Sequence, residues 1–242
     1  MNRFVAIGIS IAVSTPAFAG DWPQFRGPTA NGISVETNLP TKWSATEGVA
    51  WKAEMPGKGV SSPVVVGDVV YVTSSSGPRD DRLHLLSIDA KSGKVRWKRT
   101  LAATGSTTCH ATSCMAAPTP VATADAVYAL FATGDLAAFD ANGNPLWYRS
   151  LVSDYPTIIN QVGMASSPIL AGGLLIVPMD NVGESFVAAL DPKTGLNKWK
   201  IARPKDMNWV SPLVRTVNGK EEILFQAGKE LVAYDVATGA KT

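Results

Sequence analysis

The chain has 242 residues, of which 45% are hydrophobic and only 17% are charged. This composition can fill a hydrophobic core and excludes a chain that is disordered throughout. The formal net charge is +2, and we interpret the densest basic cluster, residues 96–99, as the solvated face of an outer strand. Such a charge balance leaves no electrostatic footprint for nucleic acid, so we expect no nucleic-acid partner.

Residues 1–19 form a predicted secretory signal peptide. Arg3 supplies a positive charge, residues 4–13 are apolar, and the Ala-Phe-Ala sequence at 17–19 matches a cleavage site before Gly20. The apolar stretch is too short to span a bilayer as a helix, and no later stretch resembles a transmembrane segment. The residue directly after the predicted cleavage site is Gly20 and not a cysteine that could carry a lipid, so we expect no lipid anchor. We therefore expect a periplasmic or secreted protein in an oxidising compartment, and a monomer.

The strongest pattern in the chain is an internal repeat. Four segments share an aspartate followed by a turn with glycine, and in three of them a tryptophan comes next. The aspartates are separated by 51, 51 and 44 residues, and a pair ending in proline leads each unit. The repeated residues are Asp89, Gly93 and Trp97; Asp140, Gly143 and Trp147; Asp191, Gly195 and Trp199; and Asp235 and Gly239, with the leading pairs Ser62-Pro63, Ala117-Pro118, Ser167-Pro168 and Ser211-Pro212.

Each unit reads as four short strands. In the first unit we expect strands over residues 64–66, 69–73, 83–88 and 95–101, separated by turns rich in Gly, Asn and Asp. Inner runs such as residues 174–177 are apolar throughout, which indicates strands that are covered on both faces. A β-sandwich would also have regular turns. A period near 50 residues with a tryptophan in the repeat favours instead an all-β propeller of four-stranded blades, about four of them in this chain.

The spacing within the motif has a physical reason. Aspartate accepts hydrogen bonds from amides in the turn, and glycine takes the left-handed backbone conformation. The tryptophan on the following outer strand can then bury a large apolar area between blades.

These residues resemble the tryptophan-docking motif of propellers of the pyrroloquinoline-quinone (PQQ) dehydrogenase type. The resemblance covers residues 51–242, and the Trp-Pro-Gln-Phe-Arg-Gly-Pro sequence at 22–28 is similar to the start of secreted PQQ-like repeat proteins. After the predicted signal peptide at 1–19, we therefore expect an N-terminal extension at 20–48 and propeller repeats at 49–242. Relatives of this type include dehydrogenases and BamB, a propeller that binds partner chains, so the motif specifies fold rather than activity.

The last unit stops one residue before its expected tryptophan, since Gly239 plus four is position 243. We expect a fragment of a larger ring, as the resemblance implies. The alternative is a four-bladed ring in which an outer strand at residues 49–54, carrying Trp51, completes the last unit and removes the exposed edges.

The resemblance also implies a PQQ and calcium site at the propeller axis, but the chain departs from it. The family's adjacent cysteine pair is missing, and calcium would need several clustered oxygen ligands. Asp180-Asn181 offers one carboxylate and one amide, which we interpret as a polar turn. We assign no catalytic residue and no metal ligand.

Cys109 and Cys114 frame the most unusual local sequence, Cys-His-Ala-Thr-Ser-Cys. We expect a disulfide between them, because the compartment is oxidising and the cysteine count is even. A metal site with His110 would lack a ligand, and His84 is the only other imidazole. Trp209 falls outside the repeat register and is interpreted as a core or plug residue, or alternatively as a platform for a planar ligand.

Hydrolase chemistry is not supported, because the chain has two histidines and no nucleophile or phosphate-binding motif. The leading interpretation is a secreted binding or scaffold module for a protein or small-molecule partner. The alternative is a PQQ- and calcium-dependent alcohol or sugar dehydrogenase.

Overall fold

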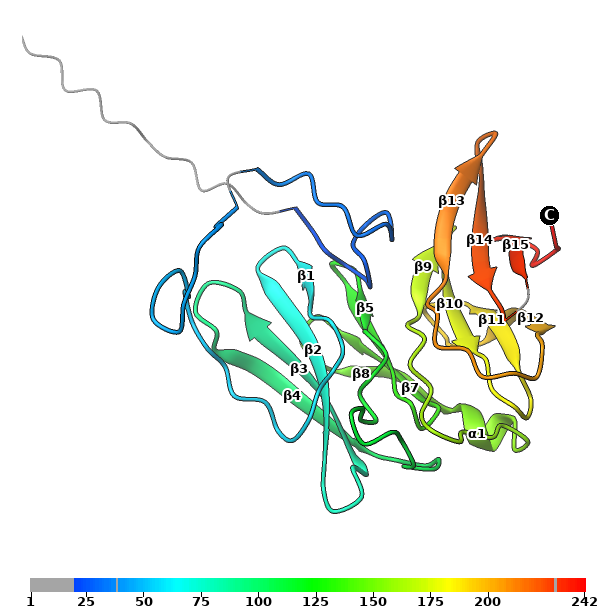
Figure 1. Cartoon of the computed structure of the whole chain (residues 1–242), viewed down its shortest axis with the longest axis horizontal. Helices are drawn as coiled ribbons and strands as arrows, with labels where there is room; N and C mark the ends of the chain where they lie inside the picture. The colour runs from blue at the N-terminus through cyan, green and yellow to red at the C-terminus, as the bar shows by residue number, and fades with distance from the viewer. Residues whose placement is uncertain (1–19, 38, 229) are drawn as a thin grey trace, which may run out of the picture.

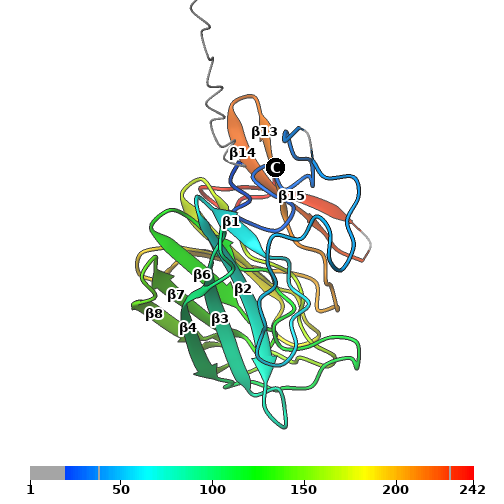
Figure 2. The ribbon, with the colours of Figure 1, turned by 90° about the vertical axis from the view of Figure 1, so that its left-hand side faces the viewer.

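The computed structural model describes residues 20–242, except 38 and 229, so the predicted signal peptide lies outside the described residues. The chain forms four antiparallel sheets that follow one another in sequence and fan out around a common side (Figure 1). Figure 2 shows the first sheet facing the viewer, with the second sheet behind and beside it. In the described part of the chain, no helix is long and apolar enough to cross a membrane.

In each sheet the strands pair in chain order, from the inner strand outward. The first sheet contains β1 (Val64–Val66), β2 (Val69–Ser76), β3 (Arg82–Asp89) and β4 (Val95–Ala102); the second β5 (Val121–Ala122), β6 (Ala126–Leu130), β7 (Asp135–Asp140) and β8 (Pro145–Ser150); the third β9 (Ile169–Ala171), β10 (Leu174–Met179), β11 (Phe186–Leu190) and β12 (Asn197–Ala202); and the fourth β13 (Leu213–Val217), β14 (Lys220–Gln226) and β15 (Leu231–Asp235). A short helix, α1 (Leu151–Asp154), follows the second sheet.

The four strands predicted for the first unit are confirmed, with ends that differ by a few residues. The largest difference is in β2, which continues to Ser76 because its backbone still pairs with β3 as far as Arg82. Hydrophobic pattern alone ends this strand early, since Ser74, Ser75 and Ser76 are polar.

Hydrophobic layers lie between successive sheets and explain the apolar inner strands. In β10, Leu175 and Val177 pack toward the second sheet, whereas Ile176 packs toward the fourth sheet. In β7, Ala137 and Phe139 pack in the same way toward the first sheet. Because side chains alternate along a strand, a sheet that is covered on both faces needs apolar residues at every position.

A line of hydrogen bonds joins the starts of the inner strands. The Ser62 amide donates to Thr119 Oγ1 (3.0 Å), the Thr119 amide to Ser167 Oγ (3.0 Å), and the Ser167 amide to Ser211 Oγ (2.8 Å). The structure therefore corrects the assignment of the second leading pair, which is Thr119-Pro120 rather than Ala117-Pro118. The hydroxyl of Thr119 accepts the amide of the preceding sheet, which an alanine side chain at this position could not do.

The N-terminal extension crosses the inner strands of three sheets. Trp22 pairs with Val65 beside β1, the Pro23 carbonyl accepts from the Ala122 amide of β5, and Gln24 Oε1 accepts from the Leu170 amide of β9. Gln24 is buried. These residues directly follow the predicted cleavage site, so the extension is part of the folded unit.

Tryptophans connect neighbouring sheets in a repeated way. Each indole N–H donates to a backbone carbonyl in the Asp-to-Gly turn of the following sheet, and each ring covers the glycine of that turn, where a Cβ would collide with it. The four bonds are Trp51 to Ala90 (2.8 Å), Trp97 to Ala141 (2.9 Å), Trp147 to Pro192 (2.9 Å) and Trp199 to Val236 (2.9 Å). The covered glycines, Gly93, Gly143, Gly195 and Gly239, all have positive φ.

The aspartate of each turn caps it from within. Asp89 Oδ1 accepts from the Ser92 amide at 2.8 Å, and Asp140, Asp191 and Asp235 each accept from an amide in the same manner. Hydrogen bonds from Thr238 hold the pKa of Asp235 below its usual value.

The predicted outer strand at residues 49–54 does not form, which is a correction. Those residues have no strand conformation, and Trp51 lies on the turn of the first sheet, whereas the fourth sheet has only three strands among the described residues. Beside β15, it is Lys241 that pairs with Tyr234. The Trp51 indole therefore makes the expected contact with a glycine turn, although the backbone of its segment does not join a sheet.

Two glycine substitutions test the inter-sheet contact. Gly195 and Gly219 both have positive φ (72° and 76°), but a Cβ would lie 2.7 Å from the Trp147 ring at Gly195 and would meet nothing within 4 Å at Gly219. Gly219→Ala is expected to cost about 1–2 kcal/mol from the left-handed backbone alone. Gly195→Ala should cost about 1–3 kcal/mol more, from overpacking. Urea unfolding of both variants provides the measurement, and equal losses would contradict a specific role for the stacked indole.

Candidate functional site

Three loops meet at one end of the molecule, each leading into an inner strand. The loops precede β5, β9 and β13, and hydrogen bonds join them: the His110 amide donates to the Val162 carbonyl (3.1 Å), and Trp209 Nε1 donates to the Gly163 carbonyl (3.0 Å). Between them lie an open hollow of about 380 Å³ and, beside it, a small recess of about 10 Å³; the two share Val162, Gly163 and Trp209. We call this region the loop groove; its main lining residues are His110, Thr112, Ser113, Asn160, Gln161, Val162, Gly163, Asn208 and Trp209.

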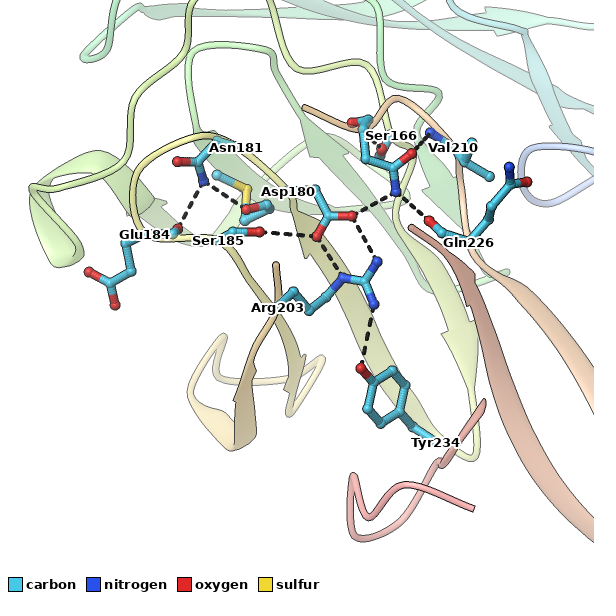
Figure 3. Close-up of polar contacts among 11 residues, drawn as sticks. Ser166, Asp180, Asn181, Glu184, Ser185, Arg203, Val210, Gln226 and Tyr234 are labelled. Carbon is cyan, nitrogen blue, oxygen red and sulfur yellow. Dashed lines mark hydrogen bonds and ion pairs between the residues drawn. The ribbon is translucent and has the colours of Figure 1, made fainter. Parts of the chain in front are cut away.

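Asp180, which contributes to the lining of the loop groove, forms a buried ion pair with Arg203 (Figure 3). Arg203 donates from Nε to Asp180 Oδ1 at 2.6 Å and from Nη2 to Asp180 Oδ2 at 2.9 Å. The side chains are 0% and 4% exposed, respectively. Burial opposes the charge of Arg203, but the hydrogen bond and charge of Asp180 outweigh it, so the pKa of the guanidinium is raised. The pair is bidentate, which fixes its geometry.

This ion pair holds the loop that carries Trp209. Asn208 Nδ2 donates to Asp180 Oδ2 (2.7 Å) and to the Gln226 carbonyl (2.6 Å), while its Oδ1 accepts from the Val210 amide (3.1 Å). Asn208 is therefore bonded through its whole amide group, and the neighbouring indole has a defined position.

Asn181 holds the loop that precedes β9 in the same way. Its Oδ1 accepts from the amides of Ile159 (3.1 Å) and Gly183 (2.8 Å), and its Nδ2 donates to the Met179 carbonyl (2.8 Å). Asp180-Asn181, predicted to be a polar turn, thus fixes both sides of the loop groove from beneath.

The groove surface is aromatic and polar. Trp209 is 49% exposed. His110 is exposed, and its Nδ1 lies 2.8 Å from Thr112 Oγ1. Among the described residues, His110 Nε2 and the side chains of Gln161 and Ser113 have no hydrogen-bond partner, which leaves these groups available to a ligand. The one carboxylate in the lining, Asp180, is already paired with Arg203.

The structure does not contain the predicted disulfide, because Cys109 and Cys114 are free thiols in it. Cys114 is buried in the layer between the first two sheets, whereas Cys109 contacts the edge of that layer and approaches Gly163. Burial raises the pKa of the Cys109 thiol. The two side chains thus contact the same hydrophobic layer, Cys114 from within it and Cys109 at its edge.

The metal alternative for this segment has no support from the positions of the imidazoles. His84 lies in β3, with its ring nitrogens 2.7 Å from Ser76 Oγ and 2.9 Å from Thr100 Oγ1. Within residues 20–242, apart from 38 and 229, no three His, Cys, Asp or Glu side chains gather to hold a metal ion.

The residues described here do not fit a calcium and PQQ site at Asp180-Asn181. Calcium takes six to eight oxygen ligands, but both Asp180 oxygens accept from the Arg203 guanidinium, and Asn181 Oδ1 accepts from two amides. A cation there would also face the charge of Arg203.

A comparison with protein families identifies the family of this chain. The model described as outer membrane protein assembly factor BamB, a PQQ-like repeat model, matches residues 33–171 and 159–242. The chain belongs to this PQQ-like, BamB-type propeller family. Among curated relatives, it is 31% identical over 170 residues to a polyvinylalcohol dehydrogenase of Pseudomonas sp. (63% of this chain, 24% of the relative). It is 28% identical over 237 residues to the polyvinylalcohol dehydrogenase of Sphingopyxis sp. (strain 113P3), covering 78% of this chain and 34% of the relative.

Solved structures share the fold at low identity. Quinohemoprotein alcohol dehydrogenase from Comamonas testosteroni matches with a TM-score of 0.66 and 18% identity, over 92% of this chain and 40% of that one. BamB from Moraxella catarrhalis matches with a TM-score of 0.51 and 20% identity, over 78% and 52%. The prediction of an all-β, PQQ-type propeller is therefore confirmed, with four sheets that match part of such a ring. The chain spans only a quarter to a third of the curated relatives.

The tertiary structure brings together residues that sequence reasoning left apart. Asp180 and Trp209 were noted separately, but Arg203 and Asn208, which connect them, were not. The sequence does carry one signal for the groove, which is the position of its loops in the repeat. Each of the three loops comes directly before a leading pair that ends in proline. The repeated Asp, Gly and Trp residues lie instead along the sheet-to-sheet contacts.

Substitutions of the ion pair test its structural role. Arg203→Met leaves a buried carboxylate without its partner and should lower the free energy of unfolding by about 3–5 kcal/mol. The double variant Asp180→Leu/Arg203→Met removes both charges and should lose less than the sum of the two single variants. Urea unfolding of the three variants measures this coupling, and strictly additive losses would show that the two groups do not act as a pair.

Proposed function

We propose that this chain is an exported binding module that takes its ligand or partner in the loop groove. The observation that carries the proposal is Trp209, an indole about half exposed and yet held in place by a buried polar network. Large side chains held rigidly at a surface hollow are typical of binding sites. The family adds support, because its model is described as an outer membrane protein assembly factor.

Cross-linking in the producing cell tests this proposal. A photoreactive phenylalanine analogue at position 209 should give an adduct of raised mass after illumination. The matched control carries the same analogue at Trp43, which is 71% exposed and lies outside the groove. Equal adducts at both positions, or none at 209, would count against a groove-specific ligand.

Export is the second part of the proposal. Cleavage before Gly20 would free an ammonium group at Gly20 N, which lies 2.5 Å from Glu36 Oε1. Intact mass of the protein recovered from the periplasm or the medium should correspond to a chain that begins at Gly20. A mass that retains residues 1–19 would contradict export by signal cleavage.

A quinoprotein dehydrogenase is the second candidate, because the two curated relatives are named polyvinylalcohol dehydrogenases and a quinohemoprotein alcohol dehydrogenase shares the fold. Titration with PQQ, with and without calcium, separates the candidates. We expect no saturable calcium-dependent binding to this chain, because the Asp180 oxygens are taken by Arg203. Saturable binding that requires calcium would favour the dehydrogenase.

A further inference from the structure

We propose that the ligand of the loop groove is a neutral sugar, with a pyranose ring stacked on Trp209 and its hydroxyls bonded to the surrounding polar side chains. The inference rests on the proposed function, since it names the ligand class of the same groove. It is carried by the ring face of Trp209, by the kind of polar groups around it and by the neutral lining.

The indole of Trp209 offers an apolar face and no free donor. Its Nε1 already donates to the Gly163 carbonyl at 3.0 Å, yet the residue is 49% exposed. A ligand can therefore gain from this side chain only by covering the ring face. The C–H face of a pyranose is flat and apolar, and it suits the electron-rich face of an indole.

The groups around the indole match hydroxyls. His110 Nε2, the Gln161 amide and the Ser113 hydroxyl have no partner among the described residues, and together they include both donors and acceptors. A sugar hydroxyl also donates and accepts, so each of these groups can bond to it. A purely apolar ligand would bury them without partners, at a cost in free energy.

The charge of the groove favours a neutral ligand. Asp180, the one carboxylate in the lining, is neutralised by Arg203, and neither hollow is lined by lysine or arginine. An anionic or cationic ligand would lose hydration without gaining an opposite charge. The larger hollow, of about 380 Å³, lies near the lower end of the usual range for small-molecule sites.

Hydrogen bonds within the protein also preorganise the loops of the groove. Asn208 is fixed by Asp180 and the Gln226 carbonyl, and Asn160 Oδ1 accepts from the Gly163 amide at 2.6 Å. The loops on both sides of Trp209 are therefore held in position, which lowers the ordering cost of binding.

Calorimetric titration of the mature chain with defined ligands tests the inference. The panel contains neutral hexasaccharides of glucose (β-1,4 and α-1,4), xylose, mannose and N-acetylglucosamine, with oligogalacturonate as an anionic sugar and polyvinyl alcohol as a flexible hydroxylated chain. We expect saturable binding of at least one neutral hexasaccharide and none of the anionic one. Trp209→Ala should weaken that binding about tenfold or more, and His110→Ala severalfold, whereas Trp43→Ala leaves it unchanged.

The outcomes separate this inference from the proposed function. If no neutral sugar binds while the analogue at position 209 still cross-links, the sugar assignment is overturned and the binding function stands. Preference for polyvinyl alcohol or for oligogalacturonate also overturns the assignment. Sugar binding that Trp43→Ala reduces as much as Trp209→Ala would place the ligand outside the groove. Absence of both sugar binding and a specific adduct at 209 removes both proposals.

Discussion

The contact of a tryptophan with the glycine turn of the next sheet is the constraint on which the structure depends. The indole N–H is bonded to a turn carbonyl and the ring lies where a Cβ would stand, so the contact has one orientation and requires glycine. Because the same contact joins the first sheet to the second, the second to the third and the third to the fourth, each sheet is set against its neighbour in the same way, and Trp51 repeats the contact from the N-terminal segment. The inner strands then become buried on both faces, and their apolar sequences follow from that burial.

The regular stacking of sheets brings the loops that enter the inner strands to one end of the molecule. Hydrogen bonds from Ser62 through Thr119 and Ser167 to Ser211 hold the starts of those strands in line. At this end the chain places a buried Asp180–Arg203 pair, which costs free energy to desolvate and needs its hydrogen bonds to be tolerated. Its visible effect is to fix Asn208 beside the exposed indole of Trp209.

Relatives of this fold are named both for outer membrane assembly and for alcohol oxidation. A shared propeller does not decide between such activities, because the chemistry depends on the loops. In this chain the carboxylate nearest the groove is committed to a guanidinium, and the free groups are an indole face, an amide, a hydroxyl and an imidazole nitrogen. Such a surface suits ligand recognition, and the groove residues that the structure describes include no paired acid and base, which is why we propose a binding function.

The repeat by itself determined the fold class, the strands of the first unit and the glycines that need positive φ, because these depend on local periodicity and turn chemistry. Only the tertiary structure decided where Trp51 goes, since its contact lies 39 residues away on the turn of the first sheet. It also showed that Thr119, not Ala117, is the second hydroxyl-bearing position, because its partners Ser62 and Ser167 lie in other sheets. The groove could not be predicted, since Asp180, Arg203, Asn208 and Trp209 meet only when β10, β12 and the loop before β13 are packed together.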